Sequence, residues 1–283
     1  MTSIESLLTG LIDYAGLYPP AGLDMRTAVR NYLDYRGSAH AQVLGRFIVD
    51  VSRFDDLREA AGEHLAAIPL SVIAPAGDFS AIERAREDGF NIECIETKSA
   101  DTLSIARTQS ALPPQVDCYC EIPFSPVTSA MLDALKTAGL RAKLRMGGVT
   151  PEAFPAAEPV VAILQELIAR GIAFKATAGL HHPVRSQHKL TYAPDSACDL
   201  MHGFLNLLAC VAILNRGGAA EDASRALREQ DPQAFRISAE EFGWRDFDWS
   251  AGELNSMRRE CFVSFGSCSF AEPIADLEAM GWL

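Results

Sequence analysis

The chain has few basic residues and no long hydrophobic run. Lysine and arginine number 25 against 37 aspartate and glutamate residues, which gives a formal net charge of −12 over 283 residues. Nucleic acids and anionic membranes bind basic surfaces, so we expect neither of them as a partner. The longest apolar stretch, residues 205–214, is shorter than the roughly 20 residues that a membrane-spanning helix needs.

Motifs of several common site types are also missing. The sequence contains no Cys-x-x-Cys pair, no His-Glu-x-x-His, no Gly-Lys-Ser/Thr loop and no Gly-x-Gly-x-x-Gly after a strand. The seven cysteines are odd in number and lie mostly in apolar stretches, which favours reduced thiols. No basic segment followed by an apolar core opens the chain, so no signal peptide is expected. These absences predict a cytoplasmic protein.

Short apolar runs alternate with helical patterns along the chain. We expect helices at 26–35, 53–65, 79–87, 102–110, 129–138, 158–170 and 198–214, and strands at 11–15, 46–50, 70–74, 92–97, 116–122, 142–145, 173–178 and 235–238. Strands alternating with helices are typical of repeated βαβ units. The sequence predicts a (β/α)8 TIM-type barrel in a single domain, 1–283, with a helical or irregular C-terminal extension from residue 219. An open doubly wound sheet is the alternative, disfavoured by the missing nucleotide motifs.

Two of these strands carry an inward lysine. Lys143 and Lys175 each stand in a short strand that ends in glycine, and a barrel places its active site at the carboxyl ends of its strands. Neighbouring strands lie ~4.8 Å apart, so two inward ammonium groups would repel each other. Repulsion and desolvation lower the pKa of a lysine, which makes it an amine nucleophile toward a carbonyl. The alternative is that buried carboxylates neutralise the lysines and no reaction occurs.

Carboxylates and histidines stand where barrel strands end. Glu96 and Glu121 close two earlier strands and could pair with a lysine or shuttle protons. His181 and His182 directly follow the second lysine strand, where barrel loops hold catalytic groups. A metal site is the alternative use of this set. His181, His182, Glu121 and His202 would then supply nitrogen and oxygen ligands to a divalent ion.

Substrate-binding groups are expected at the same end of the barrel. Arg145 and Arg185 can hold a carboxylate or phosphate through paired hydrogen bonds. Thr177 shares the inward face of its strand with the second lysine. Gly147 and Gly148 precede an expected helix start and can expose backbone N–H groups to an anion.

A polar stripe interrupts the most apolar expected helix, 198–214. Asp199, His202 and Asn206 are spaced i, i+3 and i+7, which predicts one shared helix face. Because the flanking residues are apolar nearly all round, we expect this stripe to face the pocket, with His202 and Asn206 contacting substrate. The segment Tyr14–Pro20 follows the first strand and has no assigned role.

The two lysine segments, Arg141-Ala-Lys-Leu-Arg-Met-Gly-Gly148 and Phe174-Lys-Ala-Thr-Ala-Gly179, resemble those of the deoxyribose-phosphate aldolase type of class I aldolase. The resemblance implies a β/α barrel in which Lys143, on the sixth strand, forms a Schiff base and Lys175, on the seventh, perturbs it. It also implies that a carboxylate on an earlier strand, Glu96 or Glu121, assists proton transfer. No cofactor is required by that chemistry.

Three hypotheses follow for function. The first is a lyase of the aldolase type that acts on a small carbonyl or carboxylate substrate through a barrel lysine. The second is a metal-dependent hydrolase or lyase. The third is a barrel that binds a small ligand without catalysis, since a fold by itself implies no activity. All three expect a small molecule as partner, and a homo-oligomer is compatible with each.

Overall fold

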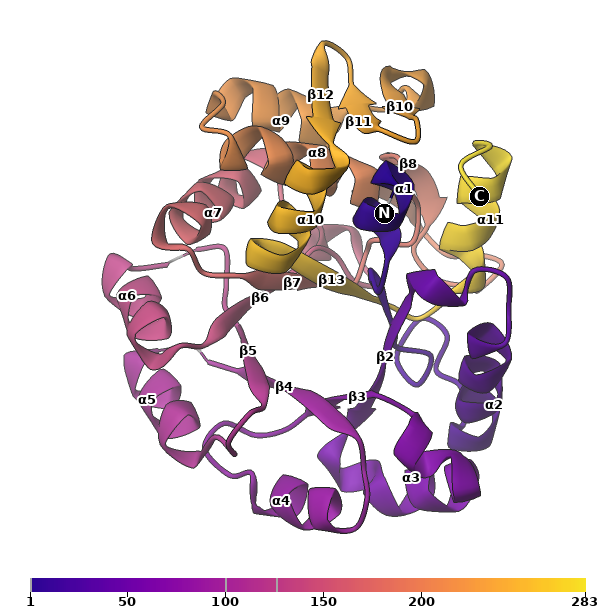
Figure 1. Cartoon of the computed structure of the whole chain (residues 1–283), viewed down its shortest axis with the longest axis vertical. Coiled ribbons are helices and arrows are strands. Elements are labelled where there is room, and N and C mark those ends of the chain that lie inside the picture. The colour runs from indigo at the N-terminus through magenta and orange to yellow at the C-terminus, as the bar shows by residue number, and fades with distance from the viewer. Residues whose placement is uncertain (1, 100, 126) are drawn as a thin grey trace.

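Eight parallel strands close into a barrel, which confirms the (β/α)8 fold predicted from the sequence (Figure 1). The structure is a computed structural model that describes residues 2–99, 101–125 and 127–283. Consecutive barrel strands pair in chain order, and the last strand closes the ring between the seventh and the first. The barrel strands are β1 (Ile12–Tyr14), β2 (Leu44–Asp50), β3 (Leu70–Ile73), β4 (Ile92–Lys98), β5 (Asp117–Glu121), β6 (Arg141–Arg145), β7 (Phe174–Thr177) and β13 (Phe262–Ser267).

Helices surround the barrel (Figure 1). The side chain of Thr128 caps the start of α6, while Gly139 and Gly171 end α6 and α7 in the left-handed conformation that glycine adopts without strain. The helices are α1 (Ser3–Leu8), α2 (Met25–Arg36), α3 (Phe54–Ala61), α4 (Ser80–Glu87), α5 (Thr102–Ala111), α6 (Ser129–Ala138), α7 (Ala157–Arg170), α8 (Phe204–Asn215), α9 (Ala220–Arg228), α10 (Ala251–Glu260) and α11 (Ala271–Ala279).

The eighth barrel strand is β13, and its predicted position at residues 235–238 is wrong. That segment forms β10 (Phe235–Ile237), which belongs to a separate antiparallel sheet with β11 (Glu241–Trp244) and β12 (Phe247–Ser250). Trp244 and Trp249 are buried and anchor this sheet. The segment 262–267 contains two serines and a glycine, so it lacks the run of β-branched residues that usually indicates a buried strand.

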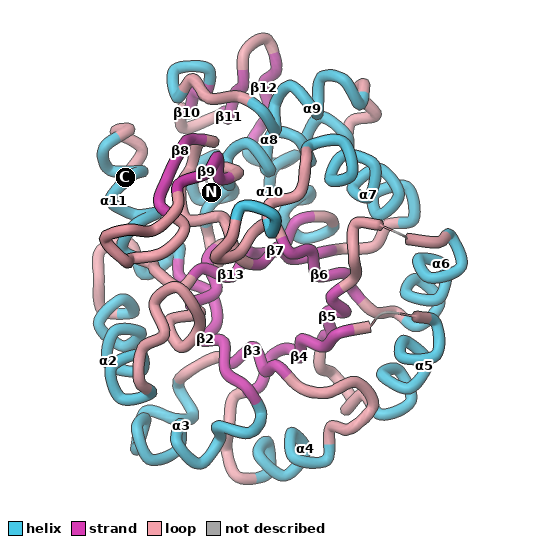
Figure 2. The backbone as a smooth tube through the Cα atoms, turned by 180° about the vertical axis from the view of Figure 1, so that it is seen from behind, coloured by secondary structure: helices cyan, strands magenta, loops and turns pink. Residues whose placement is uncertain are grey.

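The helix predicted at 198–214 begins only at Phe204. Its first part is β9 (Cys198–Met201), which pairs antiparallel with β8 (Ser186–Lys189) to form a hairpin. Gly203 precedes the helix in an extended conformation, so the chain turns there. Asp199, His202 and Asn206 therefore lie on a strand, a connection and a helix, and the prediction that they share one helix face is wrong. The hairpin lies on the side of the barrel that Figure 2 shows.

The hydrophobic core lies mainly between the sheet and the helices. In α7 the buried residues Val160, Leu164 and Leu167 recur at helical spacing and face the strands. Helix α8 is buried along almost its whole length because α9 and α10 also pack on it. Within the described residues, no helix combines the length and the apolar character needed to cross a lipid bilayer. The barrel interior, by contrast, contains charged side chains.

Candidate functional site

A cavity of about 410 Å³ opens at the carboxyl ends of the barrel strands. Its floor is formed by side chains from the strands, and its walls by the segments that follow β1, β6, β7 and β13 and by the β8–β9 hairpin. Active sites of β/α barrels lie at this end. The lining includes Tyr18, Glu96, Lys143, Arg145, Gly148, Thr177, His181, His182, Lys189, Tyr192, Cys268 and Glu272.

Lys143 lies at the floor of the cavity between two carboxylates. Its Nζ is 2.8 Å from Oε2 of Glu96 on β4 and 2.9 Å from Oε2 of Glu121 on β5. Only 5% of the residue is exposed. The neighbouring strand β5 brings Glu121 beside Lys143 because the two residues are register partners. Lys143 is thus an almost enclosed ammonium group that a ligand in the cavity can reach.

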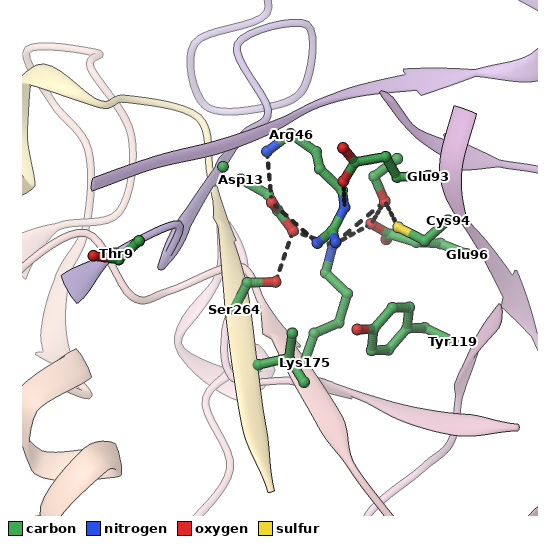
Figure 3. A network of polar contacts seen from close by, with 12 residues as sticks. Thr9, Asp13, Arg46, Glu93, Cys94, Glu96, Tyr119, Lys175 and Ser264 are labelled. Atoms are coloured by element: carbon green, nitrogen blue, oxygen red, sulfur yellow. Dashed lines mark hydrogen bonds and ion pairs between the residues drawn. The ribbon is translucent and has the colours of Figure 1, made fainter. Parts of the chain in front are cut away.

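Lys175 lies beneath the cavity and is completely buried. Its Nζ donates to Oδ2 of Asp13 at 2.6 Å and to Oε1 of Glu96 at 2.5 Å (Figure 3). The ring of Tyr119 is 5.6 Å from the same nitrogen. Figure 3 shows the Lys175 ammonium group between the carboxylates of Asp13 and Glu96. A buried charge requires such partners, and Lys175 has two.

The pKa of Lys175 is raised, which is opposite to the direction expected for this lysine from a neighbouring ammonium group. Burial lowers the pKa of Lys175, but the charges of Asp13 and Glu96 outweigh burial. For Glu96, burial raises the pKa, and Lys143 and Lys175 together hold the pKa well below its usual range. The carboxylates between the ammonium groups therefore reverse the expected shift. A raised pKa favours the protonated form of Lys175.

Asp13 lies outside the site predicted from the sequence. Its carboxylate is fully buried and accepts hydrogen bonds from Ser264 Oγ at 2.8 Å and from the backbone N–H of Arg46 at 2.8 Å (Figure 3). A Cβ at Gly45 would come within 2.4 Å of Asp13 Oδ1, so glycine lets β2 approach this carboxylate. The sequence contains one signal that could have identified Asp13: it is an acid inside an apolar strand, and acids are rarely buried there without a partner of opposite charge.

Two of the predicted substrate-binding residues line the cavity beside Lys143. Arg145 is half exposed, and its Nε donates to Oε1 of Glu121 at 3.1 Å. Thr177 ends β7 directly opposite Arg145 in the register. Burial raises the pKa of Glu121, but the charges of Lys143 and Arg145 lower it below the ordinary value. The Glu121 carboxylate therefore binds both Lys143 at the cavity floor and Arg145 at the rim.

Gly147 and Gly148 follow β6. Gly147 allows close packing, and Gly148 forms part of the cavity wall. A Cβ at Gly147 would meet Phe154 Cε1 at 2.5 Å and the Cα of Gly179 at 2.8 Å. The segments that follow β6 and β7 thus touch backbone to backbone, which only glycine permits.

The adjacent histidines occupy the cavity wall and bind different carboxylates of α11. His181 Nδ1 is 3.0 Å from Oε2 of Glu272, and His182 Nδ1 is 2.6 Å from Oδ2 of Asp276. The ring of His182 stacks on that of His188 in the β8–β9 hairpin, with centroids 3.4 Å apart. The two histidines therefore tie the hairpin and the segment after β7 to the last helix.

Four predicted binding residues lie outside the cavity lining: Gly147, Arg185, His202 and Asn206. His202 Nε2 is 2.8 Å from the carbonyl oxygen of Pro155. Asn206 is buried and donates to two carbonyl groups at the end of α9, and its Oδ1 accepts from the backbone N–H of Arg185 at 2.8 Å. The Asn206 side chain thus joins α8, α9 and the start of the hairpin. Its contacts, like that of His202, are with the protein's own backbone.

The four residues of the metal alternative are not brought together. Glu121 is bound to Lys143 and Arg145, while the three histidines bind Glu272, Asp276 and a backbone carbonyl. Within residues 2–99, 101–125 and 127–283, no group of three or more His, Cys, Asp or Glu side chains has an arrangement that could hold a metal ion. The described geometry thus gives the metal alternative no support.

Comparison with known proteins adds no family assignment. No protein-family model matches the chain, and a search of curated proteins finds no match. The function is therefore inferred from the geometry of the cavity and its charged floor.

Proposed function

We propose that the protein is a barrel lyase of the aldolase type, in which Lys143 forms a Schiff base with a small carbonyl substrate. The observation that carries the proposal is the placement of Lys143 at the cavity floor, 2.8 Å from Glu96 and 2.9 Å from Glu121. In the first step the amine adds to the carbonyl carbon, and water then leaves to give an iminium ion. Glu121 or Glu96 takes the proton that the ammonium group must lose before it can attack.

The two carboxylates suit the iminium ion as well as the ammonium ion. An iminium nitrogen carries the same positive charge at nearly the same place, so the ion pairs with Glu96 and Glu121 persist in the intermediate. In a water-poor site such preorganised charges stabilise a cation strongly. A stabilised iminium ion draws electrons from the adjacent carbon–carbon bond, and this lowers the barrier to breaking that bond.

Lys175 has a supporting role in this proposal. It is fully buried, and its ammonium group binds Asp13 and Glu96. Ser71 donates a hydrogen bond of 2.6 Å to the same Glu96 oxygen, Oε1, that Lys175 binds. Lys175 and Ser71 therefore hold Glu96 in position, with its second oxygen directed to Lys143.

The cavity rim favours an anionic substrate. Arg145, Lys189, His181 and His182 line the wall above Lys143. The carboxylate of Glu272, which lines the same wall, is paired with His181. A substrate carboxylate or phosphate would complement these groups, and Arg145 can bind it through two parallel hydrogen bonds. The chemistry needs no resident cofactor. The seven free cysteines suit a reducing compartment such as the cytoplasm.

Borohydride trapping tests the proposal. The protein is incubated with a panel of small aldehydes and 2-oxo acids, reduced, digested and analysed by mass spectrometry for adducts on lysine. We expect an adduct on Lys143 and none on Lys175. Lys143→Arg keeps the positive charge but removes the amine nucleophile, so it should abolish the adduct. Lys136→Arg is the matched control, because Lys136 lies on the outer helix α6. A panel that leaves Lys143 unmodified throughout would contradict the proposal.

Ligand binding without catalysis is the second candidate, and the pairing of both lysines favours it. Lys175 has no exposed surface, and Lys143 has two carboxylate partners at rest. The same panel separates the two candidates. A compound that raises the melting temperature of the protein and of Lys143→Arg equally, without any adduct, supports binding alone.

A further inference from the structure

A cysteine and a histidine meet on the cavity wall, apart from the lysines on the floor. Strands β13 and β7 are neighbours, with Gly266 opposite Thr177, so the segments that follow them run side by side. Cys268 comes from the first segment and His181 from the second. The Cys268 Sγ lies 3.8 Å from His181 Nε2 and 4.0 Å from Nδ1, and both side chains line the cavity.

Glu272 positions the imidazole ring. Its Oε2 is 3.0 Å from His181 Nδ1, which leaves Nε2 as the nitrogen nearer to the sulfur. Glu272 lies in the first turn of α11, where its backbone N–H donates to Ser269 Oγ at 3.1 Å. The arrangement of thiol, imidazole and carboxylate is one that activates sulfur nucleophiles, since the carboxylate orients the ring and stabilises its charged form.

The electrostatics of His181 agree with this geometry. Burial lowers the pKa of His181, but Cys268 and Glu272 outweigh burial and raise the pKa to about 9. The raised pKa favours the imidazolium form of His181 at neutral pH, and a cation beside a sulfur nucleophile is the arrangement that activates thiols.

The position of Cys268 distinguishes it from the other thiols. Cys94 and Cys210 are completely buried, and burial raises the pKa of both. Cys198 is exposed on the hairpin. Among the described residues, Cys268 is the cysteine that lines the cavity, with 5% of its surface exposed and the Tyr192 hydroxyl 3.9 Å from its sulfur. A ligand in the cavity thus meets a thiol next to an imidazole.

We propose that Cys268 is a nucleophilic thiol, that His181 holds its proton and Glu272 positions His181, and that the sulfur adds to the carbonyl carbon of an electrophile bound in the cavity. The Sγ–C bond forms as the π pair of the carbonyl moves to oxygen. The proton on His181 then passes to that oxygen, and the product is a hemithioacetal or hemithioketal. No oxidant, reductant or third reactant is needed. The proposal does not depend on Lys143 as a nucleophile.

Alkylation with limiting iodoacetamide at pH 7 tests the proposal. The rates at Cys268 and Cys198 are measured in the same sample by peptide mass spectrometry, so Cys198 serves as an internal reference. We expect Cys268 to react at least as fast as Cys198 although it is far less exposed. His181→Gln should slow Cys268 about tenfold or more, because the positioned base is lost, and should leave Cys198 unchanged.

His40→Gln is the matched control, because His40 also pairs with a carboxylate of α11, Glu278, but does not line the cavity. It should leave the Cys268 rate within about twofold, below the effect of a lost base. If His181→Gln does not fold, as judged by circular dichroism, Glu272→Gln decides and should slow Cys268 selectively. The proposal is overturned if Cys268 reacts more slowly than Cys198 in the unmodified protein, or if neither substitution changes the Cys268 rate. The alkylation measurement reports on Cys268 alone and borohydride trapping on Lys143 alone, so a failure here and a failure of trapping are distinguishable.

Discussion

Lys143 and Lys175 are register partners on adjacent strands, and their ammonium groups bind the two oxygens of one carboxylate. That carboxylate, Glu96, separates two charges that would otherwise repel each other. The remaining contacts of the two lysines differ. Lys175 binds a second buried acid, Asp13, while Lys143 faces the cavity.

Glu96→Gln should strongly destabilise the protein. The substitution removes the charge between two lysines that are buried, and breaking a buried ion pair on one side costs about 3–5 kcal/mol of unfolding free energy. Urea denaturation measures the loss. Glu121→Gln, nearer the solvent, is the comparison and should cost less, about 1.5–3 kcal/mol, the value of a hydrogen bond to a charged group. Equal losses for the two variants would contradict the central position of Glu96.

The stabilising effect of Glu96 should disappear in acid. Because burial is outweighed by Lys143 and Lys175, the folded pKa of Glu96 lies below its ordinary value of 4.5. A lowered folded pKa adds stability above pH 4.5, and this stability is lost as the pH falls from 4.5 through the folded pKa. The difference in unfolding free energy between the protein and Glu96→Gln should be largest at neutral pH and shrink below pH 4.5. A difference that stays constant down to acid pH would contradict this assignment.

Lys175→Met and Lys143→Met should distinguish the lysine needed for stability from the lysine needed for adduct formation. Removing the Lys175 ammonium leaves Asp13 and Glu96 buried without a shared cation, so we expect a loss of about 3–5 kcal/mol. Lys143→Met should cost less, about 1–2 kcal/mol, because water in the cavity can solvate the carboxylates it leaves. It should nevertheless abolish adduct formation. The opposite order of stabilities in thermal and urea unfolding would show that the lysine roles are exchanged.

His181 should stabilise the fold in a defined pH window. Its pKa is raised from 6.5 to about 9 because Cys268 and Glu272 outweigh burial. A raised folded pKa contributes stability that is fully present below pH 6.5 and is lost as the pH rises toward 9. The stability advantage over His181→Gln should therefore fall across this window. NMR titration of the ring provides the direct measurement, and a midpoint at or below 6.5 would contradict the ion pair with Glu272.

Gly147→Ala should destabilise the cavity wall. A Cβ at this position would lie 2.5 Å from Phe154 and 2.8 Å from the backbone of Gly179, so the segments after β6 and β7 must separate. Overpacking of this kind costs about 1–3 kcal/mol. Gly252→Ala is the matched control, because its added methyl group meets no atom within 4 Å and lies in helix α10, where alanine is favoured by about 0.5–1 kcal/mol. Calorimetry should show opposite shifts in the melting temperature.

Local sequence patterns were sufficient to predict most of the barrel strands but failed in the C-terminal third of the chain. The alternation of apolar runs and amphipathic stretches located seven of the barrel strands, because helical stretches separate these strands along the chain. Residues 198–201 and 262–267 escaped this reasoning. The first segment is apolar enough to extend the α8 pattern but pairs with β8, and the second is too rich in serine and glycine to indicate a strand.

The sequence by itself determined the alternating fold and the inward direction of Lys143 and Lys175, because side-chain direction follows from strand periodicity. Only the tertiary structure decided which charges meet these lysines. Lys175 binds Asp13, which is 162 positions away in the chain, and Glu96, which is 79 positions away. Cys268 meets His181 across 87 positions. Barrel closure brings β13 beside β7 and points β1 and β4 into the same interior, and no local pattern specifies which side chains then come within hydrogen-bonding distance.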